Sequence, residues 1–538
     1  MSKYRYFLTM GAICAAFLCH GLVIQKAYAL AESTAQGGSN AQAVHALGEI
    51  GEDVNVGLIT ARNALNTHEA FYDKDANGSP IGPTHAFNYD FSGDGIAPVY
   101  HDTWMAGIVA SRGGFSYPDD IGVAPGARLH CARVVNNSDS INFSWLNNAL
   151  DELITGQNCR VIVTGFSLSL TPDGQSDWAL LYDYYAYRYN VIFANAAGND
   201  NTQISLFGDA YNGITTGGLD GVDEYNRVGV LSGSGPTSDG RIKPDIVAPS
   251  QNQTMPNSSA NNSWYTWTTS GGHTSLSTPH TAGLAALLLG LADSTPDPCD
   301  SQDEVIRAVI VNSTFPNIAD KSGNPTNPAL WNKDKGYGRI DALRAYELLD
   351  SNRVFTGVNI TEEKGWAFNT ISPSHQHTYT IYAPKRHRLI ATLTWDRRVE
   401  WTDALHPYLA DLDLRIYEPN NTNAIFSKQA FGFDPSDNLI KCDYLLTASG
   451  QYTLKVVNNS ASETPSYGLA FELLPTLPGD FDLDYIVDSN DLRRISEEWL
   501  QPAPASDVDL FKDNFINFRD FAIFAENWLI TDPAYHQD

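Results

Sequence analysis

Basic residues are scarce in this chain of 538 residues. Lys and Arg number 34 against 62 Asp and Glu, so the formal net charge is −28. A nucleic-acid-binding protein contacts phosphates through clustered Lys and Arg, and this balance therefore argues against a nucleic-acid partner. Part of the acidic excess lies in residues 476–538, where an internal repeat gives it a separate explanation.

Cysteine is also rare, with six in the whole chain. Two of them lie in the N-terminal apolar segment, and the others are Cys131, Cys159, Cys299 and Cys442. None of these four has C-x-x-C spacing, which argues against a zinc site. Four cysteines permit three disulfide pairings, and the sequence does not choose among them.

Long apolar runs are limited to one, from Phe7 to about Ile24. Lys3 and Arg5 precede it, and residues 27–29 (Ala-Tyr-Ala) follow with the small-x-small pattern of a cleavage site. This layout predicts a signal peptide over residues 1–29 and a secreted, extracellular protein. The run is long enough that an uncleaved membrane anchor is the alternative, and only then is a membrane partner expected.

From about residue 54 to residue 350, within a domain expected over residues 30–350, short β-branched runs alternate with helical patterns. Nearly continuous apolar strands separated by helices predict an α/β domain, a parallel sheet with helices on both faces. Functional sites in such sheets form at the carboxyl ends of the strands. The expected strands lie at residues 54–59, 127–135, 159–166 and 190–199, and the expected helices at 104–111 and 144–154.

The pattern changes at about residue 351 to short alternating strands separated by turns. This pattern predicts an antiparallel β-sandwich over residues 351–475. Residues 474–480 contain two prolines and are expected to form a linker.

The remaining segment, residues 476–538, repeats itself after 29 residues and predicts two loop–helix units that pack on each other. Alternate Asp residues supply the hard oxygens that calcium requires, and we therefore expect a calcium site in the first loop. The second loop is the weaker candidate because Phe511 occupies its third ligand position. The candidate ligands are Asp480, Asp482, Asp484, Ile486 (through its carbonyl), Asp488 and Asp491 in the first loop, and Asp509, Asp513, Phe515, Asn517 and Asp520 in the second.

Residues 270–290 read SGGHTSLSTPHTAGLAALLLG, and Ser275 stands where an apolar helix begins. A serine here either caps the helix or acts as a nucleophile. Three other stretches bear on the choice: His101-Asp102-Thr103 at the start of a helical pattern, Asn199 after a predicted strand, and GRIKPDIVAPS over residues 240–250. In this order and at these separations, residues 54–345 resemble the subtilisin-like serine proteases.

The resemblance implies a serine endopeptidase that hydrolyses protein or peptide substrates. It makes His101 the general base, Ser275 the nucleophile and Asn199 the oxyanion donor. These roles agree with the chemistry, because a Ser hydroxyl needs a base to take its proton and a tetrahedral oxyanion needs a preorganised donor. A helix N-terminus also favours the negative charge.

The sequence departs from the family pattern at the residue that orients the base. The first strand of the family ends in Asp, whereas Thr60 occupies that position here. Asp102 stands where the family has Gly. It either substitutes for the missing acid or, as the favoured interpretation, is a carboxylate that stabilises the first turn of a helix. Trp104 and His273 are further departures. Two functions therefore stay open: a serine endopeptidase, and a weak or inactive protease-fold binding protein.

Two further resemblances concern the C-terminal parts. Residues 351–475 resemble the C-terminal β-domain of some large bacterial subtilisin-like proteases. The tail resembles dockerin modules, which implies a cohesin-like partner and tethering to a polysaccharide-associated complex. The glycine at the sixth loop position is replaced by Tyr485 and Asn514.

Overall fold

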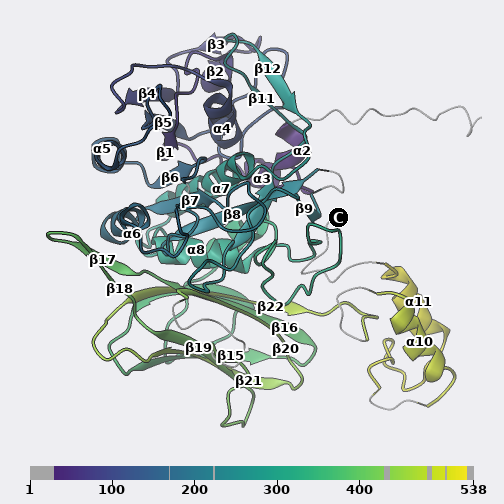
Figure 1. The fold of residues 1–538 in the computed structure, drawn as a ribbon. Helices are drawn as coiled ribbons and strands as arrows, with labels where there is room; N and C mark the ends of the chain where they lie inside the picture. Colours follow the sequence, from purple (N-terminus) through teal and green to yellow (C-terminus); the bar gives the residue numbers. More distant parts are fainter. Residues whose placement is uncertain are drawn as a thin grey trace, which may run out of the picture.

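The computed structural model describes residues 30–168, 170–221, 225–428, 437–481, 487–502 and 506–529. Figure 1 shows an α/β unit, two sheets beneath it and a small helical unit to one side. The predicted signal segment, and the candidate ligands Asp482, Asp484 and Ile486, lie outside the described residues. No helix in the described ranges is long and apolar enough to cross a bilayer.

The α/β unit is built on an eight-stranded sheet, as the sequence predicts. Its strands run in the order β10-β8-β7-β6-β1-β5-β4 and are parallel, while β9 pairs antiparallel with β8. The bounds are β1 Asn55–Thr60, β4 Ala86–Asp90, β5 Arg128–Arg133, β6 Val161–Thr164, β7 Ile192–Ala196, β8 Gly213–Asp220, β9 Arg227–Val228 and β10 Ile246–Pro249.

Helices cover both faces because successive strand residues point to opposite sides. Leu58 of β1 belongs to the core formed with α4 and α7, whereas Ile59 belongs to the core formed with α5 and α6. The helices of this unit are α2 Leu30–Thr34, α3 Ala41–Ala46, α4 Tyr100–Ala110, α5 Phe143–Asp151, α6 Asp177–Tyr189, α7 Thr274–Ser294, α8 Asp303–Asn312 and α9 Ala342–Leu349.

Smaller elements complete the α/β unit. A 3-10 turn spans Glu69–Phe71, and one π-type turn, Glu152–Gly156, continues α5. Two hairpins are formed by β2 (Asp73–Lys74) with β3 (Pro80–Ile81) and by β11 (Gln253–Pro256) with β12 (Trp264–Trp267).

The predicted antiparallel sheets follow, as two four-stranded sheets that contribute side chains to one core. One sheet has the order β13-β15-β21-β19 and the other β14-β22-β16-β20, and only the short β13 pairs in parallel. The bounds are β13 Asn359–Ile360, β14 Lys364–Thr370, β15 Gln376–Ala383, β16 His387–Trp395, β19 Leu412–Tyr417, β20 Leu439–Leu445, β21 Gly450–Asn458 and β22 Ser466–Pro475, with a hairpin of β17 Arg398–Trp401 and β18 Leu405–Tyr408.

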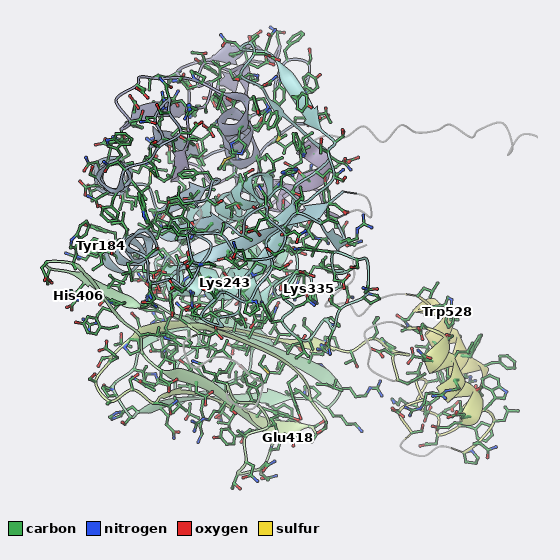
Figure 2. The ribbon with its side chains drawn as sticks, in the orientation of Figure 1. Tyr184, Lys243, Lys335, His406, Glu418 and Trp528 are labelled. Atoms are coloured by element: carbon green, nitrogen blue, oxygen red, sulfur yellow. The ribbon has the colours of Figure 1, made fainter. Side chains whose placement is uncertain are left out.

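The sheet unit packs against α8 and α6 of the α/β unit. Gly468 is required at this contact, because a Cβ atom there would lie 2.2 Å from the carbonyl oxygen of Glu304. On the other side, Tyr184 of α6 meets Trp401 of the hairpin with ring centroids 5.5 Å apart. Figure 2 shows Tyr184 near the hairpin residue His406.

The tail contains α10 (Ser489–Glu497) and α11 (Phe518–Glu526), which begin 29 residues apart, as the repeat predicts. Each helix begins with a capping box, Asp488 with Asp491 and Asn517 with Asp520. Apolar residues of both units share one small core that includes Val487, Ile495, Ile516 and Phe524.

Candidate active site

His101 lies in the first turn of α4, with its side chain 36% exposed. The helix starts four residues earlier than the apolar pattern of residues 104–111 indicates. Nδ1 of His101 lies 3.0 Å from Oδ1 of Asp102. Within the described residues Nε2 has no hydrogen-bond partner, so the outer nitrogen of the ring is free to accept a proton.

Asp102 is almost fully buried, with its side chain 2% exposed. Its second oxygen accepts a hydrogen bond from the backbone N–H of Arg62 at 2.8 Å. Each oxygen of this buried carboxylate therefore has a hydrogen-bond partner. Asp102 lies in the first turn of α4, as the favoured interpretation of the sequence holds, and it also contacts the imidazole, as the alternative of a substitute acid requires.

Thr60, at the end of β1, is 1% exposed. Its hydroxyl donates to the carbonyl oxygen of Arg62 at 2.6 Å, and the carbonyl of Ala132 lies 3.1 Å away. No hydrogen bond joins Thr60 to His101 among the described residues. Thr60 instead holds the loop whose Arg62 N–H binds Asp102.

Ser275 lies in the first turn of α7 and is 7% exposed. The N-cap of this helix is His273, so Ser275 does not occupy the capping position. A Cβ atom at Gly165, just after β6, would lie 2.2 Å from Cε of Met105 and 3.5 Å from Cβ of Ser275. Met105 is one turn beyond His101 on α4, so the two helices bring their first turns to the same end of β6.

Asn199 follows β7 and is exposed. Its Oδ1 accepts hydrogen bonds from the backbone N–H of Thr274 at 2.8 Å and from the Thr274 hydroxyl at 3.0 Å. This pair of bonds fixes the amide beside Ser275 and leaves Nδ2 without a partner in the described part of the chain. Because β7, β6 and β1 are neighbours, Asn199, Gly165 and Thr60 share the carboxyl edge of the sheet.

Two other histidines of the motif region differ in their surroundings. His273 is half-buried, and burial together with the nearby His101 lowers its pKa. Its ring meets Trp267 of β12 edge to face, with centroids 5.1 Å apart. His280 is fully buried within α7, and burial lowers its pKa to about 3. His280 is therefore neutral and inaccessible to substrate.

Four aromatic residues border the site and form what we call the aromatic wall, a feature that the sequence pattern does not predict. They are Tyr100, Trp104, Tyr265 and Trp267. Trp104 is at its centre. Its ring stacks on that of Tyr265 with centroids 5.2 Å apart, and it is tilted against the rings of Tyr100 and Trp267, at centroid distances of 4.7 Å and 5.5 Å. The departure from the family pattern at Trp104 is the one sequence feature that points to this wall, but Tyr265 and Trp267 come from a hairpin far along the chain.

The second tail loop brings together three of its predicted calcium ligands. Carboxylate oxygens of Asp509, Asp513 and Asp520 lie within 4.8 Å of one another. Asp509 also accepts the N–H groups of Asp513 and Asn514, as in a tight loop around a cation. All three residues offer carboxylate oxygens, which are the ligands that a hard cation such as calcium prefers. The carbonyl of Phe515 is 2.9 Å from Nδ2 of Asn517, so this predicted ligand already has a protein partner.

The described cysteines are free thiols, and three of them are buried. Cys131 lies in β5 behind Asp102, and burial, with a smaller contribution from that carboxylate, raises its pKa to about 12. None of the pairings that the sequence left open is formed in this structure.

Comparison with known proteins finds relatives of the α/β unit. Residues 97–338 match the model of the Subtilase family. Pyrolysin of Pyrococcus furiosus is 25% identical over 285 residues, 47% of this chain and 19% of pyrolysin. Serine protease AprX of Bacillus subtilis is 32% identical over 229 residues, 37% of this chain and 50% of AprX.

A third relative is subtilisin E of Bacillus subtilis, 28% identical over 254 residues, 46% of this chain and 58% of subtilisin E. The matched part of this chain thus spans half or less of the length of pyrolysin and of AprX. The family match starts after β1 and includes His101, Asn199 and Ser275. Residues 97–338, less than half of the chain, are thus similar to the Subtilase family, and the relatives matched include one named a serine protease.

Proposed function

We propose that this chain is a secreted serine endopeptidase in which Ser275 attacks the peptide carbonyl and His101 is the general base. Asn199 supplies the side-chain donor for the oxyanion. The observation that carries the proposal is the 3.0 Å contact between Nδ1 of His101 and the buried Asp102. It gives the imidazole an orienting carboxylate although the first strand ends in Thr60.

The proton transfers follow from this arrangement. Asp102 accepts a hydrogen bond from Nδ1–H of His101, so that the lone pair of the neutral ring is on Nε2. Nε2 takes the proton of the Ser275 hydroxyl as Oγ bonds to the carbonyl carbon, and then gives it to the leaving amine. The charge of Asp102 stabilises the imidazolium in between. Nδ2 of Asn199 donates to the developing oxyanion, the interaction that contributes most to such reactions.

An activity-based probe tests the nucleophile directly. A fluorophosphonate bonds to Oγ of an activated serine and loses its fluoride, so the wild type should be labelled and Ser275→Ala should not. Ser277→Ala is the matched control. Ser277 lies in the same helix, but it is fully buried and its hydroxyl donates to the carbonyl of Thr274. This variant should keep full labelling.

An unlabelled, folded wild type would contradict the proposal. It would favour the other function open from the sequence, a protease-fold binding protein without turnover. The probe separates the two because labelling needs the activated serine alone, whereas peptide hydrolysis also needs a matching substrate.

For the tail we propose a calcium-binding, dockerin-like module that docks on a cohesin-like partner. The support is the 29-residue repeat, the two matching capping boxes and the three converging carboxylates of the second loop. Asp509, Asp513 and Asp520 would hold the ion there, and Asp480, Asp488 and Asp491 would contribute in the first loop. Calcium would neutralise carboxylates that otherwise repel one another. Binding of an immobilised cohesin domain, with and without chelator, tests the partner.

A further inference from the structure

The first residue after the predicted cleavage site is bound to a buried carboxylate. The backbone nitrogen of Leu30 donates to Oδ1 of Asp120 at 2.6 Å, across 90 positions of the sequence. Leu30 is 0% exposed and Asp120 is 4% exposed. Burial raises the pKa of Asp120 to about 6, and the N–H groups of Leu30 and Ala31 oppose that rise. No cation of the described residues pairs with Asp120.

The side chain of Leu30 reaches the two helices of the candidate active site. It belongs to a small core with Trp104 and Ile108 of α4, Met255 of β11 and Leu276 of α7. Leu276 directly follows Ser275 in the chain. Leu30 thus packs between the helix that carries His101 and the helix that carries Ser275.

A second contact ties Asp120 itself to α4. The hydroxyl of Ser111, which directly follows the last residue of α4, donates to the backbone carbonyl of Asp120 at 2.7 Å. Gly122 closes the same loop with a hydrogen bond to the carbonyl of Ser111 at 2.9 Å. A change at Asp120 is therefore transmitted to the end of the helix that begins near His101.

Cleavage at Ala29–Leu30 would change the charge at this place. A signal peptidase adds water across the peptide bond: the hydroxyl goes to the carbonyl carbon of Ala29, and the nitrogen of Leu30 becomes an amine. An α-amino group has a pKa of about 7.7–8.0, so it is largely protonated at neutral pH. The nitrogen that already touches Asp120 would then carry a full positive charge.

We propose that removal of residues 1–29 creates an α-ammonium group at Leu30 that pairs with Asp120 and fixes α4 and α7 in their working arrangement. The competing interpretation is that Asp120 only caps the short helix α2. A cap needs N–H groups alone and tolerates an extra residue before Leu30. An ion pair does not tolerate an extra residue before Leu30, because that residue moves the charged nitrogen by about 3.8 Å.

Chemical labelling of the α-amino group tests the pair without reference to peptidase activity. The secreted protein is treated at neutral pH with an amine-specific acylating reagent, and the N-terminal peptide is quantified by mass spectrometry. We expect the mature chain to begin at Leu30 and its amine to react at least tenfold more slowly than in Asp120→Asn. Asp119→Asn is the matched control, because Asp119 is the exposed neighbour. It should react as slowly as the wild type.

A second form carries one additional Met before Leu30 and keeps Asp120. We expect it to melt at a lower temperature than the mature chain and to show a reactive amine. Equal labelling of the mature wild type before and after unfolding, an N-terminus other than Leu30, or a Met-extended form as stable as the mature chain would each overturn the proposal. If Asp120→Asn does not fold, the wild type and the extended form still decide, since both keep the native core.

Discussion

The carboxylate of Asp102 lies 3.0 Å from Nδ1 of His101, its own neighbour in the chain. Adjacent residues of a helix project about 100° apart and ordinarily do not face each other. The contact forms here because Nδ1 is the ring nitrogen nearest the backbone, within reach of the short Asp side chain. The Arg62 N–H holds the other oxygen from outside the helix.

Asp102→Asn should therefore abolish most peptidase activity. The amide group of Asn would present an N–H to Nδ1, so the proton of the ring would move to Nε2 and block the base. Loss of the orienting carboxylate in serine proteases lowers kcat by about 10⁴. We expect a decrease of this order in kcat, a much smaller change in KM and an unchanged circular dichroism spectrum.

Asp139→Asn provides the control for that experiment. Asp139 pairs with the side chain of the same Arg62 at 2.9 Å but is 86% exposed. Removing its charge should leave kcat within about twofold, since exposed pairs contribute little. If both variants lose activity equally, Asp102 acts only through local structure.

Thr60→Asp should lower activity and stability. From sequence alone, an Asp at this position restores the family pattern and is expected to raise peptidase activity. The contacts reverse this expectation, because the Thr60 hydroxyl donates to one carbonyl and lies near a second. A carboxylate would face these oxygens without a proton to donate, at a cost of about 1–3 kcal/mol. Thr60→Ser, which keeps the hydroxyl, should behave like the wild type in both assays. A gain of activity in Thr60→Asp would show that Asp102 does not serve as the orienting acid.

Much of the architecture could be predicted from the sequence, because strong periodicity fixes which faces are buried. The strands expected at 127–135 and 190–199 are β5 and β7, shortened at their ends. His101, Asn199 and Ser275 are grouped by the resemblance to the subtilisin-like serine proteases, and the general rule for parallel sheets places such a site at the carboxyl ends of the strands.

The electrostatic details could not be predicted in the same way. The His101–Asp102 contact depends on side-chain rotamers, which periodicity does not report. The Leu30–Asp120 bond joins segments 90 residues apart. Two partners of Trp104, Tyr265 and Trp267, come from β12, which pairs with β11 far along the chain.

Calcium should stabilise the tail of the intact protein. In the absence of the ion, the carboxylates of Asp509, Asp513 and Asp520 repel one another within 4.8 Å. Titration calorimetry on the full chain should show calcium binding, and chelator should lower the melting temperature of the tail transition. Asp509→Asn should weaken binding, whereas Glu526→Gln, at the end of α11 and away from the cluster, should not. Identical melting curves with calcium and with chelator would contradict the assignment.

Arg397→Met should destabilise the contact between the sheet unit and α6. Nε of Arg397 binds Asp183 at 2.9 Å, and both side chains are almost fully buried. Removing one partner leaves an uncompensated buried charge, which costs about 3–5 kcal/mol. The neighbouring Arg398 is 28% exposed and pairs with Glu463, so Arg398→Met should cost about 1 kcal/mol or less. Denaturant unfolding of the full chain measures both, and equal losses would contradict the ranking.

The pH dependence of stability should reflect a buried acidic cluster between α8 and the sheet unit. Carboxylate oxygens of Asp303, Glu304 and Asp396 lie within 4.8 Å of one another, and Arg307 pairs with Asp303 and Asp396. Burial, opposed in part by Arg307, raises the pKa of Asp396 to about 8, and burial with the adjacent Asp396 raises that of Asp303 to about 7. Burial also raises the pKa of Glu304.

These folded-state pKa values lie above the ordinary value of 3.8, so the folded protein binds more protons than the unfolded chain between about pH 4 and pH 8. The cluster's contribution to stability is complete below pH 4 and is lost as the pH rises through 7 and 8. We expect the unfolding free energy to fall over pH 6–8, by at most about 1.4 kcal/mol per pH unit for each proton.

Asp396→Asn should be less stable overall, because Arg307 loses a partner, yet the slope of its unfolding free energy against pH should be shallower. Asp403→Asn, at an exposed site in the same part of the chain, should keep the wild-type slope. A slope in Asp396→Asn as steep as in the wild type would show that the protons are bound elsewhere.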